Sequence, residues 1–284
     1  MTATLILGAV AYDPKVVTIW EGFRQWFYQA GLPFDFVLYS HYERQVEDLI
    51  AGRVHAAWNS PLAAVRAQRL AAATGRRVRA AVMRDTDQDL TSVVVCRADS
   101  VLTSPGDLKG RSVAVGAVDS PQATLIPLKL LADHGLDVEA DLTVRRFEVG
   151  VGLHGDHIGG ERLAARALAA GEVDAACMID SNHLAFSRDG TLPPDTRVLA
   201  QTGRYDHCSM TIVDTAPADS ADRFVELLLG MSYEDSRLRG LLDLEGLHEW
   251  RAGRTTGYTQ LAAAVEFTGF YDRAGRVTAP GYVP

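Results

Sequence analysis

"DLIAGRVHAAW" (residues 48–58) and "ALAAGEVDAAC" (residues 167–177) follow one pattern at two places in the chain. Each begins with apolar residues of helical spacing, reaches a glycine (Gly52 or Gly171), and continues in the same register with a valine and two alanines. Glycine at the end of a helix can take the positive φ that helix C-caps need. The repeated unit is therefore a helix that ends at glycine and leads into a short buried strand.

Two further similarities surround this unit in the same order along the chain. "TLILGAVAYDPK" (residues 4–15) resembles "RSVAVGAVDSPQ" (residues 111–122), and the helix-patterned segment after each ends in Gly-Leu, at residues 31–32 and 135–136. Short apolar strands alternate with these helices, an order that predicts a parallel sheet with helices on its faces. Three similarities in one order predict that the chain contains two similar halves.

The segments between the repeats predict how the halves are joined. Residues 93–110 read as a strand that crosses into the second half, and residues 190–213 as a loop and a returning strand, followed by helices that we expect to pack on the first half. We therefore predict an α/β fold of two similar lobes, each a mainly parallel sheet with flanking helices. Lobe 1 comprises residues 1–92 and 200–284, lobe 2 comprises residues 93–199, and a two-crossing hinge leaves a ligand cleft between them.

Composition places the chain among ordinary globular proteins. Of its 284 residues, 47% are hydrophobic and 23% are charged, which argues against disorder. The formal net charge of −8 argues against non-specific binding to nucleic acid or to an anionic membrane. Three cysteines without C-x-x-C spacing predict reduced thiols rather than a disulfide framework.

The N-terminal stretch bears on where the protein works. "MTATLILGAVAYDP" has no basic segment, and its apolar run is too short for a signal peptide or a membrane span. As the sequence stands we expect a cytoplasmic protein without membrane insertion. A periplasmic location is expected only if a leader has been removed.

Four segments carry a resemblance to a known family. The chain resembles the type II periplasmic-binding-protein fold and, within it, the phosphate/phosphonate-type ABC transporter substrate-binding family, over most of residues 4–215. The segments are "AAWNSPLAAVRA" (56–67), "SPGDLKGRSVAVG" (104–116), "SPQATLIPLKLL" (120–131) and "ALAAGEVDAACMID" (167–180). The resemblance implies a bacterial protein that closes two lobes on a small, phosphate-like or phosphonate-like anion. If exported, such a protein works with an ABC transporter permease.

Two segments depart from that family. The loop before residues 161–170 is enlarged into "GLHGDHIGGE" (152–161), and the returning strand carries "YDHCSM" (205–210), where the family usually has apolar residues and proline. The same fold also occurs in cytosolic enzymes, so the fold alone leaves binding and catalysis open.

Candidate ligand-binding residues lie at turns that lead into helices and after strands. Free N–H groups at a helix N-terminus favour an anion, although plain helix capping explains the same residues. Residues that follow strands line the crevice of open α/β sheets. The candidates at helix starts are Asn59, Ser60, Ser120 and Gln122, and those after strands or near the second crossing are Tyr12, Asp180, Asn182 and His207.

A metal site is a second hypothesis for the Gly/His loop. His154, His157 and Glu161, together with His207, offer imidazole and carboxylate ligands that suit Fe or Zn. The sequence contains no recognised metal motif, and a lone histidine is more often an ordinary polar residue.

Catalytic candidates are His207, Cys208 and His183. Neighbours on a strand point to opposite faces, which argues against His207 and Cys208 acting together. Cys208 could instead pair with His183 across the cleft, and a buried, inert thiol is the simpler reading.

Two functions follow from these observations. The first is a substrate-binding protein that closes on a small anionic ligand. The alternative is a cytosolic enzyme on the same fold that uses the His/Asp/Cys cluster in a biosynthetic or degradative pathway, with or without Fe or Zn.

Overall fold

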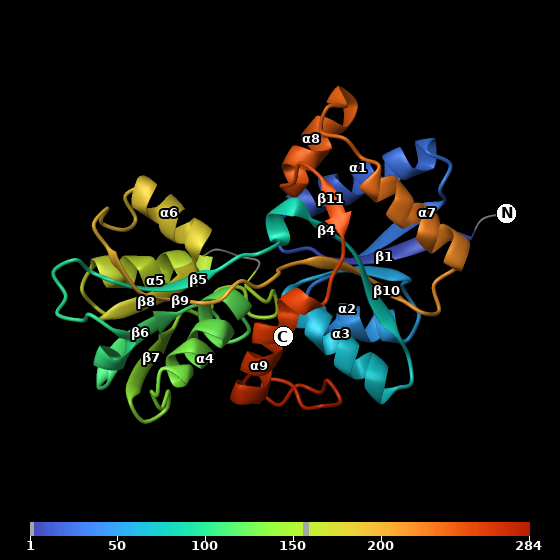
Figure 1. Cartoon of the computed structure of the whole chain (residues 1–284). Coiled ribbons are helices and arrows are strands. Elements are labelled where there is room, and N and C mark those ends of the chain that lie inside the picture. Colours follow the sequence, from blue (N-terminus) through green and yellow to red (C-terminus); the bar gives the residue numbers. More distant parts are fainter. Residues whose placement is uncertain (1–2, 156–158) are drawn as a thin grey trace.

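The computed structural model describes residues 3–155 and 159–284 and shows two lobes, each built around one sheet (Figure 1). The strands of the first sheet are β1 (Leu5–Val10), β2 (Phe34–Tyr39), β3 (Ala56–Asn59), β4 (Val78–Arg84), β10 (Ser209–Val213) and β11 (Trp250–Ala252), in the order β11-β4-β10-β3-β1-β2. The strands of the second sheet are β5 (Ser92–Cys96), β6 (Arg111–Val115), β7 (Leu142–Arg146), β8 (Ala175–Ile179) and β9 (Arg197–Gln201), in the order β7-β6-β8-β5-β9. The two-lobed α/β fold predicted from the repeats is confirmed.

Each sheet is mixed rather than mainly parallel. Strand β1 runs parallel to β2 and β3, and β6 runs parallel to β7 and β8, as the repeats predict. The difference comes from β11, which runs antiparallel to β4, and from the two strands that follow a crossing. Strand β5 enters the second sheet antiparallel to β8, and β10 re-enters the first sheet antiparallel to β3 and β4.

The two crossing segments, residues 85–91 and 202–208, pair with each other between the lobes. Leu90 and Tyr205 exchange two backbone hydrogen bonds of 2.8 Å, and the His207 N–H donates to the Asp87 carbonyl over 2.8 Å. The crossings therefore form a short paired ribbon where the lobes meet, and its residues are held in register by the backbone.

Helices flank both sheets and end where the sequence indicates. Gly52 and Gly171, the aligned glycines of the repeat, both adopt a φ of 73°. The first sheet is flanked by α1 (Lys15–Gln29), α2 (Tyr42–Ile50), α3 (Pro61–Ala73), α7 (Ala218–Leu229) and α8 (Ser236–Glu245), and the second by α4 (Ile126–Asp133), α5 (Gly159–Ala169) and α6 (Asp180–Arg188) (Figure 1). In the described part of the chain, no helix combines the length and apolar character that crossing a membrane requires.

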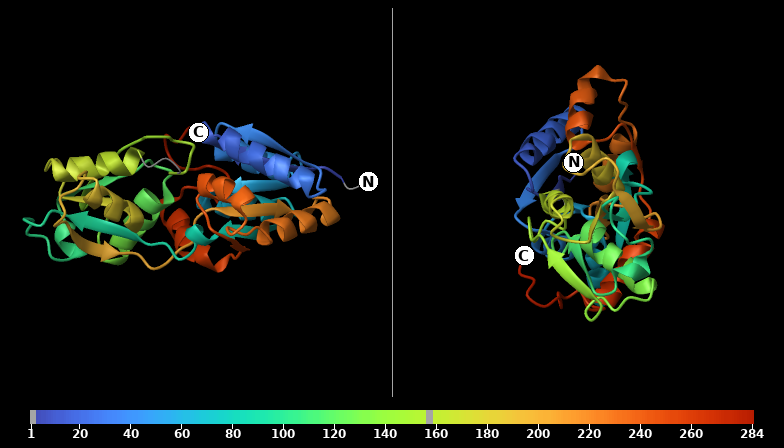
Figure 2. Two further views of the ribbon diagram at one scale, coloured as in Figure 1. Left: turned by 90° about the horizontal axis from the view of Figure 1, so that it is seen from above. Right: turned by 90° about the vertical axis from the view of Figure 1, so that its left-hand side faces the viewer.

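The last helix, α9 (Thr259–Thr268), and the segment after it lie between the lobes, whereas the sequence led us to expect packing on the first lobe alone (Figures 1 and 2). The reason is a shared apolar cluster in which buried side chains from the C-terminal segment touch both lobes. Its members include Leu62 and Val65 of α3, Leu125 and Ile126 at the start of α4, and Phe270, Tyr271 and Tyr282.

Candidate functional site

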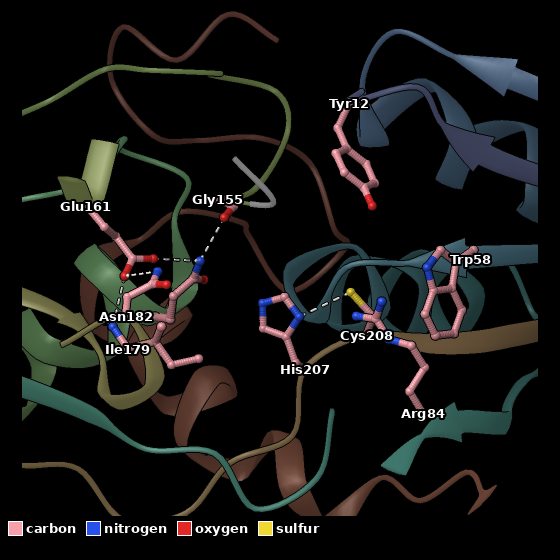
Figure 3. Close-up of a pocket in the computed structure, with 10 residues that line it drawn as sticks. Tyr12, Trp58, Arg84, Gly155, Glu161, Ile179, Asn182, His207 and Cys208 are labelled. Atoms are coloured by element: carbon pink, nitrogen blue, oxygen red, sulfur yellow. Dashed lines mark hydrogen bonds between the residues drawn. The ribbon is translucent and has the colours of Figure 1, made fainter. Parts of the chain in front are cut away.

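A cavity of about 180 Å³ lies between the two lobes (Figure 3). Its lining comes equally from both lobes: Tyr12, Trp58, Arg84, His207 and Cys208 on the first-lobe wall, and Gln122, Gly155, Glu161, Ile179 and Asn182 on the second-lobe wall. A pocket at a domain interface, lined by polar and aromatic groups, is the usual form of a small-molecule site.

The lining residues sit where strands end or helices begin. Tyr12 follows β1, Arg84 is the last residue of β4, and Ile179 is the last residue of β8. Glu161 and Asn182 lie in the first turns of α5 and α6. This placement agrees with the rule that ligands of open α/β sheets bind outside the carboxyl ends of the strands.

An ion-pair cluster forms the base of the first-lobe wall. Arg84 donates to both carboxylate oxygens of Asp87, over 2.5 and 2.9 Å, and to the carbonyl of Glu245 over 2.7 Å. Burial alone would raise the pKa of the Asp87 carboxyl, but Arg84 and His207 outweigh burial and hold that pKa at about 2. His207 Nδ1 lies 3.5 Å from Asp87 and 3.1 Å from the Cys208 sulfur.

Asp87, His207 and Cys208 bring their ligand atoms within 4.8 Å of one another, a grouping that could hold a metal ion. However, Arg84 already occupies both oxygens of Asp87 and places its own positive charge there. A metal cation bound to Asp87 would lie close to that guanidinium, and the repulsion between the two positive charges disfavours a cation there.

The second-lobe wall carries a buried acid. Glu161 is 3% exposed, and its Oε2 accepts from the Ile179 backbone N–H over 3.0 Å and from Asn182 over 2.9 Å. Its Oε1 accepts from Gln122 over 3.3 Å. Burial raises the pKa of the Glu161 carboxyl, although these three donors act in the opposite direction.

Six of the residues singled out in the sequence line this cavity, whereas His154, whose contacts are described below, and five other described ones do not. The six are Tyr12, Gln122, Glu161, Asn182, His207 and Cys208. The five have other partners. Asn59 bonds to Gln45 and Thr211, and Ser60 caps α3 and contacts His154. Ser120 caps the turn Pro121–Leu125, Asp180 accepts from Thr91, and His183 contacts Thr196.

Cys208 lies next to His207 in space as well as in sequence. The expectation that they point to opposite faces applies to residues on a strand, and β10 begins only at Ser209. His183 is on α6, away from the cavity lining, and is held by Thr196 over 3.1 Å. The pair that the structure brings together is therefore His207 with Cys208, not His183 with Cys208.

His154 is not in the cavity but is buried where the Gly/His loop of the second lobe inserts into the first. Its Nδ1 lies 2.7 Å from the Ser60 hydroxyl, its Nε2 lies 2.9 Å from the Glu43 carboxylate, and its ring stacks on Tyr42 at 4.8 Å. The hydroxyl of Tyr271 donates to the same Glu43 oxygen over 2.9 Å. The predicted metal ligands are thus separated, with His154 in this network and Glu161 and His207 on opposite cavity walls, and His157 lies outside the described residues.

Acid should weaken the contacts between Glu43, His154 and Tyr271 over a defined pH range. Burial alone would raise the pKa of Glu43, but His154 and the hydroxyls of Tyr282 and Tyr271 outweigh burial and hold it at about 2. An unfolded glutamate has a pKa of about 4.3, so the ionised Glu43 stabilises the fold fully above that value and loses its contribution as pH falls towards 2. We expect the stability difference between the wild type and Glu43→Gln to shrink as pH falls below about 5. Urea unfolding of both proteins across this range checks the expectation, and a difference that does not change with pH would contradict it.

Sequence reasoning missed four lining residues: Trp58, Arg84, Gly155 and Ile179. Two of them could have been found from their place in the sequence, because Trp58 and Ile179 lie at the ends of strands that the repeat identifies. Arg84 ends β4, a strand outside the repeat pattern. Gly155 belongs to the Gly/His loop, which the sequence singled out for its histidines and acids rather than for this glycine.

Several solved structures share this two-lobed architecture. PhnD1 from Prochlorococcus marinus, solved in complex with methylphosphonate, is 15% identical, with a TM-score of 0.65 over 94% of this chain and 98% of that one. A binding-protein component of an ABC phosphonate transporter from Pseudomonas aeruginosa is 14% identical, with a TM-score of 0.62 over 97% and 90%. A Xanthomonas citri protein solved with bound ATP is 15% identical, with a TM-score of 0.69 over 94% and 98%. At these identities the likeness establishes the fold alone.

The family assignment comes from the sequence itself. No curated protein matches the chain. Residues 9–258 match the family described as "ABC transporter, phosphonate, periplasmic substrate-binding protein". That description supports a small-molecule binding protein and gives no support to the alternative of a cytosolic enzyme. This match covers most of the chain, and the fold and the cavity between the lobes agree with it. The chain therefore belongs to the family of phosphonate-type ABC transporter substrate-binding proteins.

Proposed function

We propose that the protein binds a small phosphonate-like oxyanion in the cavity between its lobes. The observation that carries this proposal is the convergence of hydrogen-bond donors from both lobes on one small space. Trp58 and Asn182 offer N–H groups, Tyr12 offers a hydroxyl, and His207 offers its ring. An oxyanion consists almost entirely of acceptors and suits such a lining.

The size of the cavity favours a ligand of few heavy atoms. At about 180 Å³ it is smaller than the roughly 300–1,000 Å³ of pockets that hold drug-sized molecules. A methylphosphonate ion, the ligand of the Prochlorococcus protein, has only five heavy atoms and is of suitable size. A nucleotide such as the ATP of the Xanthomonas structure is far larger, so the cavity supports the smaller class of ligand.

His207 should contribute strongly to binding, because it lies on the cavity wall with Arg84 and Asp87 behind it. A hydrogen bond that involves a charged group contributes about 1.5–3 kcal/mol, which is roughly a 10- to 100-fold change in affinity. We therefore expect His207→Ala to weaken methylphosphonate binding by about that factor in isothermal titration calorimetry, and His248→Ala, at a largely exposed histidine, to leave it unchanged. Equal affinities in the wild type and His207→Ala would contradict the proposal, as would a wild type that binds neither methylphosphonate nor phosphate.

The proposed partner is an ABC transporter permease, and the proposed place of action is the periplasm. The family description supports both. Fractionation of cells that express the complete gene product, with periplasmic and cytoplasmic marker enzymes, tests the location. Recovery with the cytoplasmic marker alone would contradict a role in uptake.

A further inference from the structure

Glu161 is a buried acid on the wall of a cavity proposed to hold an anion. Its side chain comes from the first turn of α5 and lies across the cavity from His207 (Figure 3). Its three hydrogen-bond donors, the Ile179 N–H and the amides of Asn182 and Gln122, are all neutral. The carboxylate is therefore held in a fixed orientation without a cation among these partners to neutralise it.

A carboxylate and a fully ionised oxyanion cannot share this space at low cost. Both are acceptors only, and two like charges separated by a few ångströms in a protein interior repel each other strongly. The repulsion is replaced by attraction if one proton lies between them, since an O–H···O⁻ hydrogen bond is short and strong. A phosphonate monoanion carries such a proton on one of its oxygens. A sulfonate of the same shape has no O–H near neutral pH.

We propose that Glu161 makes the pocket selective for oxyanions that carry a proton, so that it accepts hydrogen phosphonates and rejects the matching sulfonates. This inference rests on the proposed function and adds the means by which the site distinguishes two anions of nearly equal size. The hydrogen-bonded geometry supports it, because the Ile179 N–H and the Asn182 amide fix Oε2 while Oε1 has a single, longer bond of 3.3 Å. Oε1 is thus the oxygen with capacity to accept from a ligand.

The protonation of Glu161 itself gives the selectivity a pH dependence. Burial raises the pKa of this carboxyl, so it takes up a proton at a higher pH than an exposed glutamate does. A protonated Glu161 can donate to a sulfonate. The preference for phosphonate should therefore be largest where Glu161 is ionised and the phosphonate is still a monoanion. It should narrow at higher pH, as the phosphonate loses its remaining proton, and at lower pH, as Glu161 takes one up.

The test compares methylphosphonate with methanesulfonate by isothermal titration calorimetry, with wild type and Glu161→Gln. At about pH 6.5, where methylphosphonate is mainly the monoanion, we expect the wild type to bind methylphosphonate at least about tenfold more tightly than methanesulfonate, which is the scale of one hydrogen bond to a charged group. In Glu161→Gln the neutral amide can donate to either anion, so the two affinities should come within about threefold, mainly because methanesulfonate binds better. Glu172→Gln, a surface carboxylate paired with Arg145, is the matched control and should keep the wild-type preference.

The wild type alone provides a second test that does not depend on how the variant folds. Its preference for methylphosphonate over methanesulfonate should fall as pH rises from about 6.5 to about 9, because methylphosphonate then loses the proton that Glu161 accepts. Methanesulfonate has no proton to lose and serves as the reference for any other group that titrates on the cavity wall. A preference that is constant over this range would overturn the inference.

Other results would also overturn it. They are equal affinities of the wild type for the two ligands at about pH 6.5, or an unchanged preference in a folded Glu161→Gln. A Glu161-dependent gain for 2-aminoethylphosphonate over ethylphosphonate would assign the carboxylate to an ammonium group instead. If the wild type and the variant both bind neither anion at any pH, the proposed function itself fails, and the inference fails with it.

Discussion

Replacing Glu43 with alanine is expected to lower the free energy of unfolding by about 3–5 kcal/mol, the usual cost of removing one partner of a buried ion pair. Glu43 and His154 are 3% and 0% exposed, and the distance between their charged atoms is 2.9 Å. Without Glu43, the Tyr271 hydroxyl also loses an acceptor in a buried place. Urea unfolding at neutral pH, followed by tryptophan fluorescence, measures the change.

The control for this prediction is Glu21→Ala, which removes a carboxylate that pairs with Arg24 on the exposed surface of α1. Solvent screens an exposed pair of this kind, so its loss should change the free energy of unfolding little. A double-mutant cycle with His154→Ala separates the pair from its surroundings, and its coupling energy should account for most of the loss. If Glu43→Ala costs no more than Glu21→Ala, the inserted loop does not hold the lobes together in the way described.

The second large effect is expected from Gly257→Ala. A Cβ at this position would overlap the side chain of Asp206, which is 1% exposed and accepts two 2.6 Å hydrogen bonds from Arg254. The carboxylate cannot move without breaking that ion pair and shifting its neighbour His207 on the cavity wall. We expect a loss of about 1–3 kcal/mol in stability from overpacking and, in addition, weaker binding of methylphosphonate.

The matched control is Gly240→Ala, because this glycine lies inside α8 and a Cβ there meets no atom within 4 Å. Alanine in a helix interior is more favourable than glycine by roughly 0.5–1 kcal/mol, so this change should stabilise the protein. Thermal unfolding and calorimetry on both variants give the two readouts. A Gly257→Ala protein with wild-type stability and affinity would show that Asp206 and His207 are not positioned through this contact.

The fold was predictable from the sequence because a repeat constrains it at many points at once. Gly52 and Gly171 lie at equivalent helix ends with the same φ of 73°, and the strands after them occupy equivalent places in their sheets. The antiparallel direction of β5 and β10 was not predictable in this way. It follows from how the chain crosses between the lobes, and hydrophobic pattern alone does not show strand direction.

The candidate site was only partly predictable, because sequence shows which residues follow strands but not which partners they meet. Tyr12 and Asn182 reach the cavity as their positions after strands indicate. Asn59 and Ser60 occupy a similar turn, yet Gln45, Thr211 and His154 take up their hydrogen-bonding groups. Those partners come from distant parts of the chain, and a local pattern carries no information about them.

The central claim is that one small oxyanion occupies the cavity between the lobes, and anomalous diffraction tests it most directly. Crystals grown with methylarsonate, an arsenic analogue of methylphosphonate, would reveal the position of the arsenic atom. The account predicts a single strong peak per chain between His207 and Glu161, within contact distance of both side chains. A strong peak anywhere else on the chain, or no peak at saturating ligand, would contradict it.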